Sequence, residues 1–288
     1  MKKLNSLYAL VYKSLFGLGF MVLALSVSCT SEIEPTTAFD EASIAADIIA
    51  QADYEEVDDI SSNMMEVAEG GSGGRVTGFK DDRCNCAEVT HDKENQIITI
   101  DFGDGCAGPN GVVRSGKIII NYDGRRFVPG SSWVVTFEEF YMNRRHIEGV
   151  RTVTNISESL EADPKFHIVL EGGKVTWPDE TFATREVDRV RVWIRATNPI
   201  LDEHHILARS TTEGINKKGV NYSTLVLEDL VYKRACRDSR RGRIPVAGVK
   251  EVVHGDRTYT IDFGDGECDT IVIITSGDET STVDLSDR

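Results

Sequence analysis

The sequence predicts a mainly β fold, either an antiparallel sandwich or a large curved sheet, with a short N-terminal amphipathic helix. From about residue 75 onward, short runs of alternating apolar and polar residues recur at intervals typical of antiparallel strands. Turn signals such as Asn110-Gly111, Asp123-Gly124 and Gly172-Gly173 supply the positive φ that tight hairpins need. No long helical pattern interrupts these runs, which disfavours a parallel sheet because its crossovers need helices. The clearest runs are 97–102, 117–122, 133–141, 146–154, 166–170, 174–177, 187–195, 225–232, 258–263 and 271–275.

Residues 40–74 predict an acidic amphipathic helix followed by a glycine-rich hinge. Asp40 is suited to cap the helix, and Gly70-Gly71-Ser72-Gly73-Gly74 is suited to end it. Apolar residues recur among the carboxylates at steps of mostly three or four, which indicates one apolar stripe over about six or seven turns. We expect the stripe to pack against the β domain, 75–288, and the rival interpretation is a partner-binding helix. The stripe consists of Ile44, Ile48, Ala52, Val57, Ile60, Met64 and Val67.

The first residues are typical of a lipoprotein export signal. Lysines at positions 2, 3 and 13 precede an apolar run over 15–25, which is too short to span a bilayer. The small residues Ser26-Val27-Ser28 lie directly before Cys29. We therefore predict a signal peptide over 1–28, lipidation of Cys29, and a tether over 29–39. The expected location is the outer membrane or cell surface, where disulfides persist.

The charge balance is acidic. The chain carries a net charge of −15, and removing the three lysines of the signal peptide brings the exported form near −18. Between residues 30 and 74 there are 12 acidic residues and no lysine or arginine. This balance argues against nucleic acid as a partner.

Five cysteines remain besides Cys29, so at least one thiol stays unpaired. Cys236 and Cys268 are the two in the C-terminal half, and we expect them to form a disulfide. Cys106 has two candidate partners, Cys84 and Cys86, between which spacing does not decide. Zinc is the rival ligand for these three cysteines, but Cys-x-Cys is shorter than the usual zinc spacing and the exported compartment favours disulfides.

A seven-residue motif occurs twice without change. Thr-Ile-Asp-Phe-Gly-Asp-Gly spans 99–105 and again 260–266, and Cys106 and Cys268 follow the two copies. A shorter strand precedes each copy, through Val89-Thr90 in the first and Val252-Val253 in the second. The repeat predicts a duplicated hairpin near both ends of the β domain.

These residues resemble a family of uncharacterised Bacteroidetes-type surface lipoproteins. The resemblance rests on 98–106, on Arg114-Ser115-Gly116-Lys117-Ile118, and on 259–266 with Cys268-Asp269, and it covers most of the exported chain. The stretch from Cys86 to Thr90 also belongs to it. The resemblance therefore implies that Cys86, and not Cys84, pairs with Cys106. It implies no reaction.

The repeated motif has two interpretations. Asp101 and Asp104, with Asp262 and Asp265 in the second copy, are candidate Ca²⁺ ligands because Ca²⁺ takes six to eight oxygens. The alternative, which we favour, is that the aspartates cap the turns that their glycines make. No other cofactor is expected.

The run 185–195 is the sharpest candidate for a binding surface. Alternation places Val187 on one strand face together with one tryptophan and four arginines. Val190, Val192 and Ile194 point the other way. An exposed tryptophan among arginines is suited to hold a sugar ring or an anionic glycan. The rival interpretation is that the arginines pair with carboxylates of the next strand. The candidate ligand-binding residues are Trp193, Arg185, Arg189, Arg191 and Arg195.

Two other groups of residues carry weaker signals. Trp133, Phe137 and Tyr141 share one strand face, which predicts core packing. The run Asp202-Glu203-His204-His205 holds ligand-type residues, but neighbours in a loop rarely converge on one ion.

The sequence names no reaction. It contains no Gly-x-Ser-x-Gly elbow, no His-Glu-x-x-His and no phosphate loop with lysine. We therefore expect a non-catalytic, lipid-anchored envelope or cell-surface protein that binds a glycan or protein partner or serves a structural role. The alternatives are a polysaccharide-acting hydrolase and a calcium-stabilised adhesion module.

Overall fold

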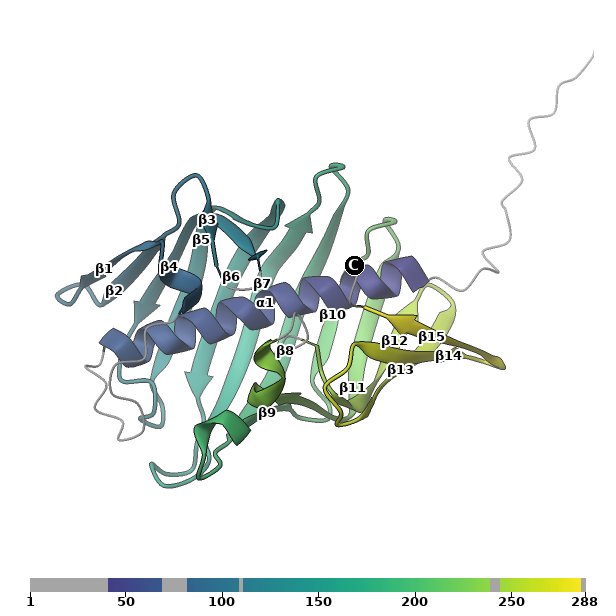
Figure 1. The fold of residues 1–288 in the computed structure, drawn as a ribbon. Helices are drawn as coiled ribbons and strands as arrows, with labels where there is room; N and C mark the ends of the chain where they lie inside the picture. Colours follow the sequence, from purple (N-terminus) through teal and green to yellow (C-terminus); the bar gives the residue numbers. More distant parts are fainter. Residues whose placement is uncertain (1–40, 69–81, 109–110, 239–243, 286–288) are drawn as a thin grey trace, which may run out of the picture. The chain divides into compact units, whose positions relative to one another are not determined.

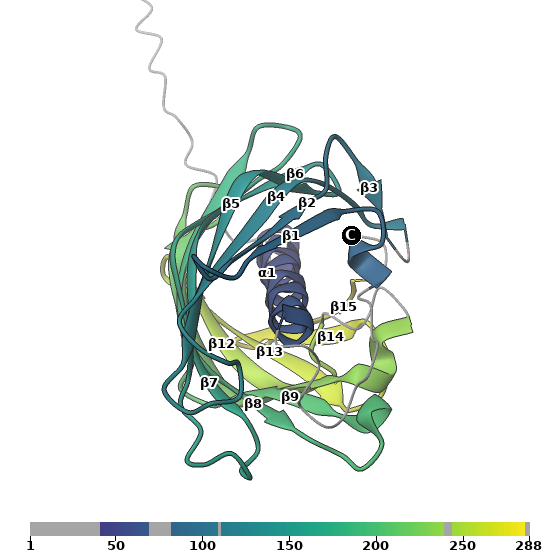
Figure 2. The same ribbon diagram turned by 90° about the vertical axis from the view of Figure 1, so that its left-hand side faces the viewer.

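A computed structural model describes residues 41–68, 82–108, 111–238 and 244–285. They form one 15-stranded antiparallel sheet that curls around a single long helix, α1 (Glu41–Ala68), as Figures 1 and 2 show. The prediction of a mainly β, antiparallel fold with an N-terminal helix is confirmed, and the sheet is the large curved one. Asp40, the predicted signal peptide and tether, and the glycine-rich hinge lie outside the described residues.

The strands follow each other through the sheet almost in chain order. The path is β1-β2-β4-β5-β6-β7-β8-β10-β11-β12-β13-β14-β15, with β3 beside β4, and β9 beside β8 and β11. Their bounds are β1 Glu88–Asp92, β2 Ile97–Asp101, β3 Cys106–Ala107, β4 Val113–Tyr122, β5 Ser132–Met142, β6 Arg145–Asn155, β7 Lys165–Thr176, β8 Phe182–Ile194, β9 Glu203–Ile206, β10 Thr211–Ile215, β11 Asn221–Lys233, β12 Ala247–His254, β13 Arg257–Asp265, β14 Ile271–Ser276 and β15 Glu279–Asp284.

The helix connects two hydrophobic clusters of the sheet. Its first turns, with Ile44 and Ile48, pack with apolar side chains of β11 to β15. Its later turns, including Val57 and Ile60, pack with apolar side chains of β2 and β4 to β8. Because α1 contributes to both clusters, it holds the two halves of the sheet together. No helix among the described residues has the length and apolar character needed to cross a membrane.

An irregularity in β5 changes which of its aromatic residues enter the core. Trp133 and Val135 are buried as alternation predicts, but the register with β6 shifts between Val135 and Tyr141. Glu139 adopts φ +44 within this stretch. After the shift Phe140 and Met142 are buried, and Tyr141 instead stacks on His146. The prediction that Trp133, Phe137 and Tyr141 share one face is therefore wrong for Tyr141, which lies beyond the bulge.

The two copies of the repeated motif lie in two hairpins near opposite ends of the sheet. β1 pairs with β2, and β12 pairs with β13. The phenylalanines of the two copies, Phe102 and Phe263, are both buried. Beyond them the copies diverge, because β2 ends at Asp101 whereas β13 continues to Asp265. Each copy thus lies in a two-stranded hairpin, and the two copies differ in the residues that follow the phenylalanine.

Disulfides close both of these units. Cys86 is bonded to Cys106, and Cys236 is bonded to Cys268, which confirms both predicted pairs. Each bridge links the segment before a hairpin to the residues after its repeated motif. In the chain-entropy treatment of cross-links each contributes about 3 to 4 kcal/mol. Cys84 is buried and belongs to neither disulfide.

The bulge in β5 also fixes the identity of one glycine in β4. Gly116 has φ +76, and a Cβ there would lie 1.8 Å from the carbonyl oxygen of Glu139. We expect Gly116→Ala to lower the free energy of unfolding by about 3 kcal/mol, because both the backbone conformation and the neighbouring strand oppose a side chain. Denaturant unfolding measures the change.

Gly277 is a matched control, since it has φ +59 but a Cβ added there would meet no atom within 4 Å. Gly277→Ala carries only the backbone penalty of about 1 kcal/mol. Equal losses for the two variants would show that the contact with Glu139 does not matter.

Candidate functional site

The predicted arginine and tryptophan face lies on β8, on the concave side of the sheet that faces α1. Arg185, Arg189 and Arg191 are only 3 %, 6 % and 8 % exposed. The expectation of an exposed ligand platform is therefore wrong for these residues. Alternation along the strand placed them on one face correctly, but that face is covered by the helix.

The carboxylates that meet these arginines come from α1 and not from the next strand. Arg189 donates to Glu55 and, at 2.7 Å, to Asp58. Arg191 donates to Asp59 at 2.8 Å. The acidic character of α1 is thus complementary to the basic character of β8.

The same pairing continues across the sheet on other strands. Arg151 on β6 donates to both carboxylate oxygens of Asp58. Arg145, also on β6, forms a bidentate pair with Asp53, with both N to O distances at 2.7 Å. Further along α1, Arg114 pairs with Glu56, and Arg126 pairs with Glu66 at 2.7 Å.

The first half of the helix has its own charged contact. Nζ of Lys250 on β12 lies 3.1 Å from a carboxylate oxygen of Asp47 and 3.1 Å from the side-chain oxygen of Gln51. Gln51 donates in turn to the Tyr232 hydroxyl at 2.7 Å. Arg185 approaches Asp47 at 3.7 Å. Polar contacts therefore follow α1 over most of its described length.

Because these ion pairs are buried, each charged side chain depends on its counter-ion. Burial alone would raise the pKa of Asp58, but the positive charges of Arg151 and Arg189 outweigh it and hold the pKa below the ordinary value. The pKa of Asp47 is lowered in the same way beside Lys250 and Arg185. The carboxylates are therefore ionised at neutral pH, and the loss of one partner would leave a buried charge uncompensated.

Some N–H donors of the buried arginines make no hydrogen bond within the described residues. Nη1 of Arg151, Nε of Arg185 and Nε of Arg189 are buried without a hydrogen-bond partner within the described part of the chain. Oδ1 of Asp47 on α1 likewise has no hydrogen-bond partner there, so the match between the helix and the sheet is incomplete on both sides.

The remaining members of the predicted platform have separate surroundings. Trp193 lies half-buried between Phe127 and His204, and its Nε1 donates to Asp202 at 3.0 Å. Arg195 follows the end of β8 and donates to the carbonyl oxygens of Glu161 and Ala162 in a neighbouring loop. Neither side chain is part of the row of arginines beneath α1.

The run 202–205 does not converge on one point. Asp202 also accepts from the Ala196 amide, and Nε2 of His205 lies 2.8 Å from Glu203. Nδ1 of His204 accepts from Nε of Arg191 at 3.2 Å. Among the residues that the structure describes, no group of three or more His, Cys, Asp or Glu is placed to hold a metal ion.

The aspartates of the repeated motif cap their own turns. Asp101 accepts from the Gly103 amide at 2.8 Å, and Asp262 accepts from the Gly264 amide at 2.9 Å. Asp265 accepts from the Glu267 amide at 3.4 Å. These contacts match the favoured turn-capping interpretation. A Ca²⁺ site that also includes Asp104 stays a prediction, and Cys29, the predicted lipidation site, lies outside the described residues.

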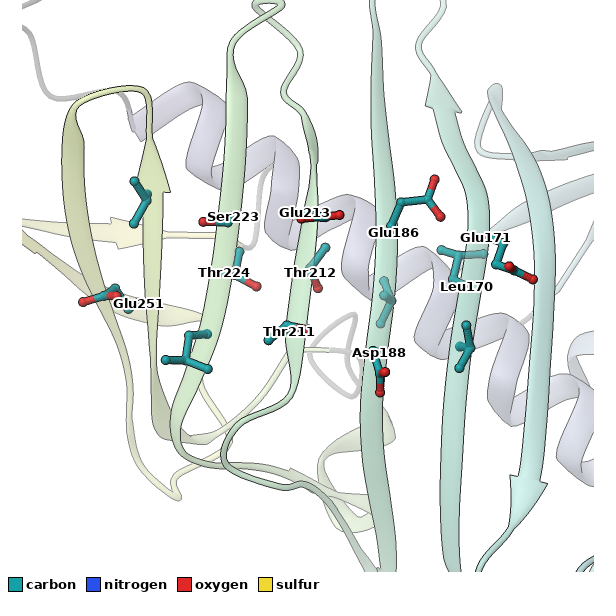
Figure 3. Close-up of a pocket in the computed structure, with 14 residues that line it drawn as sticks. Leu170, Glu171, Glu186, Asp188, Thr211, Thr212, Glu213, Ser223, Thr224 and Glu251 are labelled. Carbon is teal, nitrogen blue, oxygen red and sulfur yellow. The ribbon is translucent and has the colours of Figure 1, made fainter.

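A shallow hollow lies over β7, β8, β10, β11 and β12, on the side of the sheet away from α1 (Figure 3). Its volume is about 590 Å³. The described residues that line it include five acids, three threonines and one serine, with no basic or aromatic side chain. Figure 3 shows α1 passing behind these strands. The acids are Glu171, Glu186, Asp188, Glu213 and Glu251.

Two of these carboxylates face each other directly. Glu213 on β10 is the register partner of Glu186 on β8, which places like charges opposite one another. Glu186 accepts from the Gly172 amide at 3.0 Å, and Asp188 contacts His167 at 2.7 Å. No hydrogen bond or ion pair within the described residues engages the Glu213 side chain. Sequence reasoning missed this hollow, because it gathers acids from four strands whose order is set by the fold.

Comparison of the chain with models of protein families, with curated proteins and with solved structures finds no match.

The first prediction for this site concerns Asp58, which faces both Arg151 and Arg189. We expect Asp58→Asn to lower the free energy of unfolding by about 3 to 5 kcal/mol, because it leaves buried guanidinium charge without its counter-ion. Asp188→Asn is the control: its carboxylate is exposed and its contact with His167 is worth about 1 kcal/mol or less. Equal effects of the two changes on the denaturant midpoint would contradict the importance of the buried network.

The pH dependence of the Asp58 effect has a defined sign. A folded-state pKa below the unfolded one gives stabilisation that is fully present above the unfolded pKa of about 3.9 and is lost as pH falls through the folded pKa. The difference in unfolding free energy between wild type and Asp58→Asn should therefore shrink below about pH 4. A difference that stays constant down to about pH 2 would contradict ionic pairing.

Proposed function

We propose that this protein is a non-catalytic, lipid-anchored envelope or cell-surface protein that binds a protein partner through the convex face of its sheet. The observation that carries the proposal is the acidic hollow, with Glu213 and Glu186 opposed across β8 and β10. A cationic group bound between them would relieve their repulsion, so the binding energy has a defined source.

The chemistry of the lining favours a basic segment of a protein over a sugar. No aromatic side chain among the described lining residues offers a face for ring stacking. Lysine and arginine side chains suit the carboxylates, and the exposed Leu225 suits their aliphatic stems. The arginines of β8, which the sequence offered as candidates for glycan binding, are engaged with α1.

Glu213→Gln tests this proposal, because binding and stability should change in opposite directions. Removing one of two opposed charges should raise the free energy of unfolding by about 0.5 kcal/mol. The same change should weaken binding to lysine- and arginine-rich peptides on an array by about ten-fold, the effect of roughly 1.4 kcal/mol.

Glu158→Gln is a matched control, since Glu158 is an exposed acid in the loop between β6 and β7. It should change neither quantity. A glycan array, followed by turnover assays on any hit, covers the other outcomes. Selective glycan binding without peptide binding would contradict the choice of partner, and release of shortened sugars would contradict the non-catalytic function.

The membrane anchor has a separate test. Labelled palmitate should enter the wild-type protein, and Cys29→Ala should abolish the labelling, because the thiol of Cys29 is the predicted start of the lipidated chain. Labelling of the Cys29→Ala variant at the wild-type level would overturn the anchor.

A further inference from the structure

We propose that the convex face carries a second binding site, a row of side chains at one end of β5, β6, β7 and β8, and that its ligand is a neutral oligosaccharide. The row shares no residue with the acidic hollow. It is therefore a function beyond the binding of a protein partner. The row consists of Tyr141, His146, Thr176 and Phe182.

Strand pairing aligns these side chains. Tyr141 on β5 is the register partner of His146 on β6, which is in turn the partner of Thr176 on β7. Thr176 is the register partner of Phe182 on β8. Three strand spacings separate the first residue from the last, so the row is about 14 Å long. It is long enough for more than one sugar ring.

The row lies on the side of the sheet away from α1. Arg145, next to His146 in the sequence, points to the concave side and pairs there with Asp53 of the helix. Successive side chains of a strand point to opposite faces, so His146 points outward. The sequence neighbours of the other three row members are buried in the core, which places those members on the outer face too. These neighbours are Phe140, Met142, Val175 and Ala183.

Irregular backbone surrounds the row. A register shift ends at Tyr141 in β5, another begins at Glu148 in β6, and a third ends at Gly173 in β7. Glu139, within the first shift, has φ +44, a conformation that residues other than glycine rarely adopt. Bulges re-aim side chains, and strained backbone is concentrated at functional sites. Here the first bulge turns Tyr141 out of the core and onto the convex face.

Aromatic rings lie at both ends of the row. The rings of Tyr141 and His146 are stacked, with their centroids 4.6 Å apart and their planes at 19°. Phe182, at the other end, is 46 % exposed. The electron-rich face of an aromatic ring attracts the C–H groups on the apolar face of a sugar. Ring surface at two separated points suits a ligand that is itself built from repeated rings.

Charged side chains border these rings. Nζ of Lys174 lies 3.1 Å from a carboxylate oxygen of Glu148 and 5.5 Å from the centroid of Phe182. The Tyr141 hydroxyl donates to Glu139 at 3.3 Å. The side chains of Lys174 and Glu148 are 39 % and 38 % exposed, so their polar atoms are within reach of a ligand.

This combination favours a neutral sugar over other ligands. A sugar carries hydroxyl groups around an apolar ring face, which matches aromatic rings bordered by hydrogen-bonding groups. A lipid or an apolar protein surface would cover the charged groups without satisfying them. The two carboxylates outnumber the one lysine, so an acidic sugar would be repelled.

Phe182→Ala tests the site on an array of neutral and acidic oligosaccharides with the full-length protein. The wild type should bind neutral oligosaccharides, and the variant should bind the best of them about ten-fold more weakly, because it lacks one stacking surface. Tyr141→Ala should have a similar effect. Ile271→Ala is the matched control, since Ile271 on β14 is 45 % exposed and lies outside the row. It should bind like the wild type.

Denaturant midpoints establish that each variant is folded. If Tyr141→Ala does not fold, Phe182→Ala decides, and if neither folds, Lys174→Gln decides by the same loss of affinity. The proposal is wrong if the wild type binds no neutral oligosaccharide, if it prefers acidic ones, or if the folded row variants keep wild-type affinity.

The same measurements separate this site from the acidic hollow. Glu213→Gln should leave oligosaccharide binding unchanged, and Phe182→Ala should leave binding to basic peptides unchanged. A loss of oligosaccharide binding in Glu213→Gln would contradict two separate sites.

Discussion

The ion pairs between α1 and the concave face of the sheet are the interaction on which the rest of the structure depends. A long antiparallel sheet needs a body to curl around, and here that body is one helix whose carboxylates and apolar side chains are both buried. Arg151, Arg189 and Asp58 lie close enough together that removing any one leaves the others uncompensated. The apolar contacts supply the favourable burial, and the ion pairs give the buried carboxylates of α1 basic partners on the sheet.

This arrangement divides the chain's chemistry between two faces. The concave face carries most of the buried bases and is occupied by α1 within the same chain. The convex face keeps acids that no basic side chain of the described hollow neutralises, with Glu186 and Glu213 directly opposed.

The repeated hairpins serve the ends of the sheet. Each has a buried phenylalanine that anchors it to a hydrophobic cluster, and each is closed by a disulfide. An open sheet is weakest at its edges, where a strand has one neighbour only. The first hairpin includes the edge strand β1, whereas β14 and β15 lie between the second hairpin and the other edge, so the cross-link strengthens an edge directly at one end only.

The sequence by itself determined the strand runs, the helix, the duplicated hairpins and which residues of β8 share a face, because these follow from local periodicity and turn chemistry. It also predicted both disulfides, although the choice of Cys86 rested on resemblance. Only the tertiary structure decided that the face of Arg185, Arg189 and Arg191 turns inward, since period-two alternation separates two faces without saying which is covered. The bulge at Glu139 and the acidic hollow likewise depend on strand neighbours distant in the chain.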